Sequence, residues 1–598
     1  LIEVDAFERF MHKAYLGQKQ FSIEGLDMTV PMLDEAIELS AAAGAREVVI
    51  GMAHRGRLNV LAHNLGRPYE TIFGEFEGTS SVSVVKAVTE IPQGGTGDVK
   101  YHHGAQGSYQ LPGGDSILVN ASDLYGSAFA ADDFVAVLDR LGIGRVDVYG
   151  DSYGTFLGQT FAIRHPDRVR TLTLDAAYPV AGQHPWYPDL NRAMRSAFRL
   201  VCQRDPSCHG DPVRRFHRAA DRLRHRPLTG RAFDADGTRR RVRVDPGELA
   251  YVMGVATYGT TVYQELDAAV RAWRHGDPAP LLRIAAEQGS YGSAGPVRSF
   301  SEGAYVSVIC NDYPQLWDIS AAPAARRQQY DARVARLKRL HPHVFAPFTV
   351  DDWLSSAWTE YASCRPWPSP STWVPPVEEP VTYPDLPVLV LVGDLDSITS
   401  AEGARIVAGH FPSARIVEVA NVGHVTALGD HAGCASVLVR RFVRTRDPGD
   451  TSCARDANPR VRLVQEFPRS WRGYSVPAGR GLGRDRRIAA AAVHTLGDLF
   501  PRWFAMYGGR GRGLRGGGFT TTGLVQVDFR LRRMRLVSDL AVSGHLHWSR
   551  PAGTVRANVT LGGGHTGRLR VRWDDASGRA KAWGHVGGRR VAIGLRAP

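Results

Sequence analysis

The chain has 598 residues, of which 43% are hydrophobic and 22% are charged. This composition is typical of folded globular proteins and excludes a wholly disordered or fibrous chain. No apolar run approaches the roughly 18 residues that a membrane-spanning helix needs, so we expect no membrane span. We also expect no signal peptide, because no basic start is followed by an apolar stretch.

The net charge of +13 is unevenly distributed along the chain. Residues 446–598 contain 28 Lys and Arg against 10 Asp and Glu, whereas residues 1–445 contain 45 against 50. Four of the six lysines lie in the first 100 residues, and arginine replaces lysine almost everywhere after them. These shifts indicate that the chain joins segments of different origin.

The cysteine pattern predicts disulfides. An even number of cysteines in loop-like contexts is typical of an oxidising compartment, although six free thiols are the alternative. No Cys and His cluster has the spacing of zinc ligands, so we expect no metal site. The expected pairs are Cys202–Cys208, Cys310–Cys364 and Cys434–Cys453. The first and the third pair close short loops.

Residues 1–120 are predicted to form helix, loop, helix, strand and helix, with the strand at Glu47–Gly51. Four sequence motifs of this region, taken in order, resemble the E1 component of 2-oxoglutarate dehydrogenase. They are Phe21–Gly25, Val49–Leu61, Phe73–Gly78 and Gly97–His102. That family uses thiamine diphosphate. The resemblance implies that His54 and His102 would lie near substrate and cofactor, although a lone histidine is more often structural.

The resemblance stops before the residues that would hold the cofactor. No Gly-Asp-Gly-like motif with a following Asn comes after this region, and Gln20 stands where the family usually has Arg. Thiamine diphosphate needs Mg²⁺ and directed donors for its diphosphate. We therefore interpret residues 1–120 as a truncated fragment, and expect thiamine diphosphate and Mg²⁺ only if that fragment were functional.

Residues 121–445 alternate between strand-like and helix-like segments, which predicts a parallel sheet of the α/β class. Strands are expected at Arg145–Gly150, Arg168–Asp175, Pro387–Gly393 and Ala414–Ala420. A long insertion separates the second strand from the third. The pattern predicts a core at 121–180, an insertion at 181–380 and a second core segment at 381–445.

Three residues of this region have the pattern of a catalytic triad. Ser152 lies in Gly150-Asp-Ser-Tyr-Gly154, a G-x-S-x-G nucleophile elbow between a strand and a helix. Asp396 and His424 follow the ends of the third and fourth strands, in the chain order that this elbow requires. Asp394 is the less favoured alternative acid. The backbone N–H of Tyr153 is the expected oxyanion donor.

Longer motifs in this region resemble α/β-hydrolases of the tripeptidyl/prolyl aminopeptidase type. The resemblance implies that 181–380 is a cap whose acids hold a substrate's free amino terminus, with Glu302 and Asp312 as candidates. It also implies a mostly secreted family. The motifs that carry it are Asp123–Gly126, Gly150–Thr155, Cys310–Pro314, Cys364–Pro368, Gly393–Asp396 and Gly423–Thr426.

The same resemblance predicts that the first strands of the hydrolase sheet, with their oxyanion loop, are missing. The family has a His-Gly-Gly-Pro-Gly-like loop on an earlier strand, which supplies the second oxyanion donor. Residues 1–120 contain no such loop, so the front strands of the sheet are expected to be missing. The predicted fold is an α/β-hydrolase parallel sheet without its front strands, with a helical cap and a C-terminal antiparallel β domain.

The tail is predicted to contain a linker and helix at 446–499 and a β-rich basic domain at 500–598. A helix is expected at Ile488–Tyr507, followed by six alternating segments between Leu524 and Leu595. Period-2 alternation with short turns predicts an antiparallel meander, as a small β-sandwich or an open barrel that folds independently. Its arginines alternate onto one face. We interpret them as a solvated face and expect no nucleic-acid partner, because no aromatic stacking pattern accompanies them.

These observations favour a serine hydrolase that cleaves a peptide or ester through Ser152, His424 and Asp396, without a cofactor and impaired by the lost oxyanion loop. One alternative is a fragment with the chemistry of the thiamine-diphosphate enzyme. The other is an inactive chimeric chain whose competent part is a β-rich binding domain.

Overall fold

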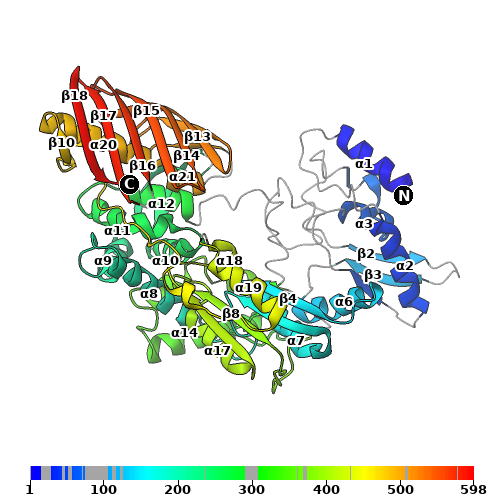
Figure 1. Ribbon diagram of the computed structural model, residues 1–598. Coiled ribbons are helices and arrows are strands. Elements are labelled where there is room, and N and C mark those ends of the chain that lie inside the picture. The colour runs from blue at the N-terminus through cyan, green and yellow to red at the C-terminus, as the bar shows by residue number, and fades with distance from the viewer. Residues whose placement is uncertain are drawn as a thin grey trace. The chain divides into compact units, whose positions relative to one another are not determined.

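The computed structural model describes residues 2–14, 28–42, 47–50, 57–70, 72–73, 105–110, 116–121, 126–235, 237–289, 308–359, 361–367, 374–430, 432–505, 509–574 and 577–598. They belong to two compact units (Figure 1). The first unit comprises residues 1–133, 294–326 and 361–376, and the second unit comprises 134–293, 327–360 and 377–598.

The first unit contains three N-terminal helices and a small sheet. Helices α1 (Ile2–Ala14), α2 (Thr29–Ala42) and α3 (Arg57–His63) share one apolar core. Strand β3 (Ser116–Ala121) pairs parallel with β1 (Glu47–Ile50) and antiparallel with β2 (Ala105–Gln110). The helices and the strand β1 occur in the predicted order.

The second unit contains the parallel sheet expected from the sequence. Its strand order is β4 (Val146–Asp151), β5 (Val169–Asp175), β8 (Val388–Gly393) and β9 (Ala414–Val419), and every neighbouring pair is parallel. All six residues of β8 are buried, as expected for a strand covered on both faces. The helices that follow three of these strands are α7 (Tyr153–Arg164), α17 (Ala401–His410) and α19 (Cys434–Thr445).

The insertion between β5 and β8 is mainly helical. A hairpin of β6 (Leu228–Phe233) and β7 (Arg239–Val244) is its one two-stranded sheet among the described residues. Its longer helices are α8 (Pro188–Arg204), α9 (Pro212–His225), α10 (Pro246–Val255), α11 (Thr260–Arg274), α12 (Ala279–Gln288) and α14 (Pro323–Leu340).

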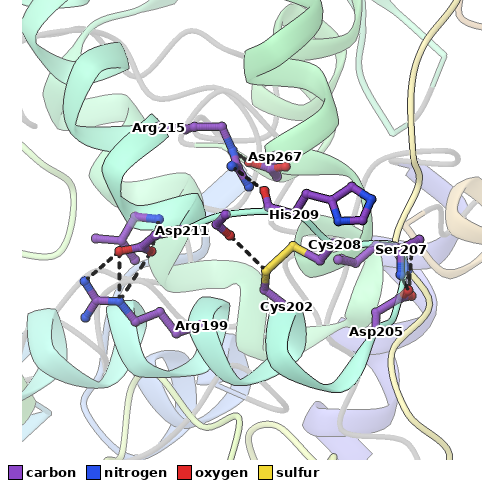
Figure 2. The surroundings of a disulfide bond; sticks show 12 residues. Arg199, Cys202, Asp205, Ser207, Cys208, His209, Asp211, Arg215 and Asp267 are labelled. Atoms are coloured by element: carbon purple, nitrogen blue, oxygen red, sulfur yellow. Dashed lines mark hydrogen bonds and ion pairs between the residues drawn. A yellow bond between two sulfur atoms is a disulfide. The ribbon is translucent and has the colours of Figure 1, made fainter.

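All three predicted disulfides are present: Cys202–Cys208, Cys310–Cys364 and Cys434–Cys453. Cys202–Cys208 closes the turn from α8 to α9 (Figure 2). The turn is also held by polar contacts, because Asp211 caps α9 by accepting the N–H of Val213 at 2.9 Å. Arg199 on α8 donates to the same carboxylate at 3.2 Å.

The C-terminal region forms one antiparallel sheet of nine strands in the order β10-β18-β17-β16-β15-β14-β13-β12-β11. Helix α20 (Gly483–Gly497) packs on one face of the sheet, and the two share a single hydrophobic core that extends back to Trp471. The strands are β10 (Ala478–Arg480), β11 (Arg510–Arg512), β12 (Gly518–Thr522), β13 (Gln526–Met534), β14 (Ala541–Ser549), β15 (Thr554–Gly562), β16 (Gly567–Asp574), β17 (Arg579–Val586) and β18 (Arg589–Arg596).

Three features of this region differ from the sequence prediction. The described strands form a single sheet with a helix on one face, not a sandwich or an open barrel. The expected helix at Ile488–Tyr507 is two helices, α20 and α21 (Leu499–Ala505), because Pro501 lacks the N–H that a continuous helix would need. The core also includes α20, so it crosses the predicted boundary at residue 500.

A buried ionic network joins the tail to the insertion. Arg502 on α21 is 2% exposed and donates to both carboxylate oxygens of Glu265 on α11, at 2.9 and 3.0 Å. It also donates to Asp498 at 2.8 Å and lies 3.0 Å from Glu287 on α12. Arg283 on α12 donates to Asp498 at 2.9 Å. The C-terminal sheet is therefore tied to the insertion by charges that are removed from water.

We expect Arg502→Ala to lower the free energy of unfolding by about 3–5 kcal/mol, because it leaves buried carboxylates without their shared cation. Urea denaturation followed by circular dichroism measures this change. Arg510→Ala removes an exposed arginine of β11 and should change the free energy by less than ~0.5 kcal/mol. Equal stability of the two variants would show that the network contributes nothing.

Candidate active site

Ser152 lies in the sharp turn between β4 and α7, where the backbone is strained. Its φ is 52° and its ψ is −120°, a conformation that is rare for a residue with a side chain. Glycine is required at position 150, because a Cβ there would lie 2.1 Å from the carbonyl oxygen of Gly154. The N–H of Ser152 donates to the carbonyl of Asp175 at 3.0 Å, which fixes the turn against the neighbouring strand.

The structure brings Ser152, His424 and Asp396 into one hydrogen-bonded line. The Oγ of Ser152 lies 2.7 Å from Nε2 of His424, and Nδ1 of His424 lies 2.9 Å from Oδ2 of Asp396. The side chains of His424 and Asp396 are 4% and 0% exposed. The same carboxylate accepts the Thr399 hydroxyl at 2.6 Å and the Thr399 N–H at 2.9 Å. These hydrogen bonds from Thr399 fix the orientation of the Asp396 carboxylate that contacts His424.

Asp394 has a different environment from Asp396. It forms an ion pair with Arg204 of α8 and accepts the N–H of Asn421 at 2.8 Å. Its carboxylate therefore connects the insertion to the loop that follows β9, whereas Asp396 contacts His424.

The loop that carries His424 must fold back over the edge of the sheet. Ser152 follows the first strand of the order and His424 follows the fourth, three strand spacings or roughly 14 Å away. Asp175, at the end of the intervening β5, holds this loop. Its buried carboxylate accepts the N–H of Thr426 at 2.7 Å and the N–H of Ala427 at 2.6 Å. Asp175 is thus a positioning residue for the histidine.

The insertion also contacts the histidine loop. The N–H of His424 donates to the carbonyl of Thr257 at 3.1 Å. The ring of Tyr258 stands edge-on to the imidazole with centroids 5.4 Å apart, and this tyrosine is 64% exposed. Tyr258 is therefore an exposed aromatic group next to His424.

The surrounding charges set the basicity of His424. Burial alone would lower its pKa. The charge and hydrogen bond of Asp396, with smaller contributions from Asp175 and Asp151, outweigh burial and raise the pKa of His424 above its ordinary value. The site therefore stabilises an imidazolium, the form that appears when histidine accepts a proton.

Tyr153 is the first residue of α7, directly after Ser152. Its backbone N–H lies at a helix N-terminus, where the helix dipole favours negative charge. The predicted oxyanion donor is therefore placed beside the predicted nucleophile by the elbow itself.

The sequence predicted four further site residues. His54, His102 and Glu302 are outside the described residues. Asp312 belongs to the first unit, where its carboxylate accepts the N–H of Ser127 at 3.1 Å and the Ser127 hydroxyl at 2.6 Å. That contact lies at the start of helix α6 (Ser127–Arg140), so Asp312 acts there as a helix cap. The binding roles expected for these four residues stay predictions.

Strand β4 is the outer strand of the parallel sheet among the described residues. Apolar side chains are exposed on it and on the segment before it. These exposed residues are Phe134, Val137, Leu141, Ile143 and Tyr149.

Asp175, Thr399 and Tyr258 were not singled out from the sequence. One signal could have identified Asp175: it is the last residue of a predicted strand, at the same sheet edge as Ser152 and Asp396. Tyr258 and Thr399 had no such signal, because their positions depend on how the insertion and the acid loop pack.

Comparison with known proteins links two parts of the chain to hydrolases. A family described as "alpha/beta hydrolase fold" matches residues 106–201, and one described as "TAP-like protein" matches 350–453. The predicted fold class is confirmed: an α/β-hydrolase parallel sheet with helices, plus a C-terminal antiparallel sheet.

Similar solved structures include proline iminopeptidase from Mycobacterium smegmatis, at 16% identity and a TM-score of 0.20, covering 54% of this chain and 73% of that one. An α/β hydrolase fold protein from Nakamurella multipartita is 15% identical with a TM-score of 0.20, covering 57% of this chain and 86% of that one.

The N-terminal region is similar to a different family. The 2-oxoglutarate dehydrogenase E1 component of Bacillus licheniformis is 57% identical over 112 residues, which are 18% of this chain and 12% of that protein. The multifunctional 2-oxoglutarate metabolism enzyme of Mycolicibacterium vanbaalenii is 49% identical over 125 residues, 20% of this chain and 9% of that protein. The chain spans about a tenth of the length of these curated relatives.

We expect Gly150→Ala to destabilise the protein, because the new Cβ meets backbone at 2.1 Å and the elbow must move. A loss of about 2–4 kcal/mol, in the range for strained backbone substitutions, should appear in thermal unfolding. Gly154→Ala is the matched control. Its Cβ would meet only Asp151 Oδ1 at 3.7 Å, so its stability should be unchanged or slightly higher. A Gly150→Ala variant as stable as the Gly154→Ala variant would contradict this account of the elbow.

Proposed function

We propose that this chain is a serine hydrolase that acts through Ser152, His424 and Asp396. One observation carries the proposal: the line of contacts from Ser152 Oγ to His424 Nε2 at 2.7 Å and from His424 Nδ1 to Asp396 at 2.9 Å. A serine hydroxyl is a weak nucleophile until an adjacent base removes its proton. The strained elbow places that hydroxyl at the start of α7.

The chemistry is acyl transfer in two steps. The Oγ of Ser152 attacks the substrate carbonyl while Nε2 of His424 accepts the hydroxyl proton. The N–H of Tyr153 donates to the developing oxyanion. His424 then protonates the leaving amine or alcohol, and the bond from the carbonyl carbon to that group breaks. Water, deprotonated by His424, hydrolyses the acyl-serine and regenerates Ser152. Asp396 holds the imidazole in the tautomer that both steps need.

The finer assignment is an aminopeptidase-type peptidase or an esterase. The family match described as "TAP-like protein" at 350–453 includes Asp396 and His424, which supports this substrate class. Residues 1–120 contain no His-Gly-Gly-Pro-Gly-like loop, so the proposal includes the loss of the second oxyanion donor. Loss of one such donor lowers kcat by roughly 10²–10³. Activated esters should therefore be better substrates than amides.

The similarity of the N-terminal region to 2-oxoglutarate dehydrogenase E1 supports a common origin for that segment. The match covers 12% of the first relative, so we propose no decarboxylase activity for this chain.

Hydrolysis of p-nitrophenyl acetate and of an amino-terminally free peptide p-nitroanilide tests the proposal. We expect measurable ester hydrolysis, slower anilide hydrolysis, and a loss of at least ~10³ in kcat/KM for Ser152→Ala. Ser413→Ala removes an exposed serine hydroxyl outside the site and serves as the control. Ester hydrolysis that survives Ser152→Ala would refute the assignment of the nucleophile.

The pH profile separates the positioning role of Asp175 from a purely structural one. His424 must be neutral to act as base, so the rate falls as pH drops through its pKa. Asp175 contributes to the raised pKa, and Asp175→Asn should shift the acidic limb of the kcat/KM profile to lower pH while lowering the plateau. A lower plateau with an unmoved acidic limb would mean that Asp175 acts only on the fold.

A further inference from the structure

The C-terminal sheet has two faces of opposite character. Side chains alternate along β15, β16 and β17, so that every second residue is buried in the core shared with α20 and its neighbours are exposed. On β15, β16 and β17 the buried positions are apolar, and most of the exposed positions are cationic. The exposed cations of these strands are Arg556, Arg568, Arg570, Arg572, Arg579 and Lys581.

The strand register places these cations directly opposite one another. Arg556 on β15 is opposite Arg572 on β16, and Arg572 is opposite Lys581 on β17. Like charges in opposite positions of a sheet destabilise it. An exposed face can be solvated without opposed cations, because uncharged polar residues, Asn558 and Thr560, fill the next exposed positions of β15. The opposed cations therefore lower the stability of the sheet.

The described residues of this face include few acidic groups. Asp528 on β13 is paired with His547 at 2.9 Å, and Asp574 ends β16. Within the described strands, Arg556, Arg570 and Arg572 have no carboxylate partner. The field of these cations is therefore not neutralised by the sheet itself.

The cations form a two-dimensional array. They occupy three adjacent strands at roughly 4.8 Å spacing and alternate positions roughly 7 Å apart along each strand. Trp583 lies among them, opposite Arg570, and is 42% exposed. Indole rings favour the headgroup level of a bilayer, where one end is apolar and the other is wet.

We propose that this face, defined by Arg556, Arg568, Arg570, Arg572, Lys581 and Trp583, docks the protein on an anionic phospholipid surface. Charge complementarity selects the occupant, because phosphate headgroups present a planar array of anions that matches the array of cations. A track for single-stranded nucleic acid would need successive aromatic side chains, and the array contains one.

Co-sedimentation of the full chain with vesicles tests the proposal. The chain should bind vesicles with about a third phosphatidylglycerol in phosphatidylcholine, should not bind phosphatidylcholine alone, and should release as salt increases. Each basic residue near such a surface contributes about fivefold to the affinity, so Arg556→Gln/Arg570→Gln/Arg572→Gln should weaken binding roughly a hundredfold. The thermal unfolding temperature of this variant should rise, because opposed like charges are removed.

Three further variants keep the test decisive. Arg568→Gln/Lys581→Gln removes two other cations of the face and should weaken binding about 25-fold. The control Arg333→Gln/Arg336→Gln/Arg339→Gln removes three exposed arginines from α14 and should bind as the unchanged chain does. Ser152→Ala should also bind unchanged, because the surface does not depend on the proposed active site.

Three results would overturn the proposal. One is equal weakening by the α14 control, which would mean that net charge alone drives binding. Another is equal binding to neutral and anionic vesicles. The third is tighter binding to a single-stranded DNA oligonucleotide than to anionic vesicles, with loss of that binding in the Arg556/Arg570/Arg572 variant, which would identify a nucleic-acid surface.

Discussion

The candidate active site depends on the parallel pairing of four strands. Parallel pairing places the carboxyl ends of β4, β8 and β9 at one edge, and each end is followed by one member of the triad. Pairing alone is insufficient, because Ser152 and His424 follow the two outer strands. The loop after β9 must cross the end of β5, and the carboxylate of Asp175 holds it there by two backbone N–H groups. The position of the base therefore depends on a buried acid that has no direct contact with Ser152 Oγ.

A second set of buried charges connects the remaining parts of the second unit. Arg502 and Arg283 link the tail to α11 and α12, while Asp394 and Arg204 link the acid loop to α8. Asp205, directly after α8, accepts a hydrogen bond from the guanidinium of Arg596 at 2.8 Å. Burial would raise the pKa of Asp205, but its hydrogen bonds, above all the one from Arg596, keep that pKa well below its usual range. The insertion is thus tied to the catalytic core and to the C-terminal sheet by ion pairs, of which those of Arg283 and Arg502 are buried.

Local patterns predicted the strands, and long-range contacts decided what was missed. Alternation located β13 to β18, and buried apolar runs located β4, β5, β8 and β9, because each element carries its own periodicity. The triad could be predicted since strand ends converge at one edge. Strands β10 and β11 have only three residues each, and β12 has five and follows a glycine-rich run, so no alternation marked them. The partners of Arg502 and Asp175 are 237 and 251 residues away in the sequence, beyond any local pattern.

The central claim is that Ser152 is an activated nucleophile, and labelling by a fluorophosphonate followed by peptide mass spectrometry tests it most directly. The reagent carries its own leaving group, so labelling relies on the Ser152–His424–Asp396 relay more than on a second oxyanion donor. The account predicts one phosphonyl adduct, on Ser152, that is absent in His424→Ala. An adduct on another serine, or none on a folded chain, would contradict it.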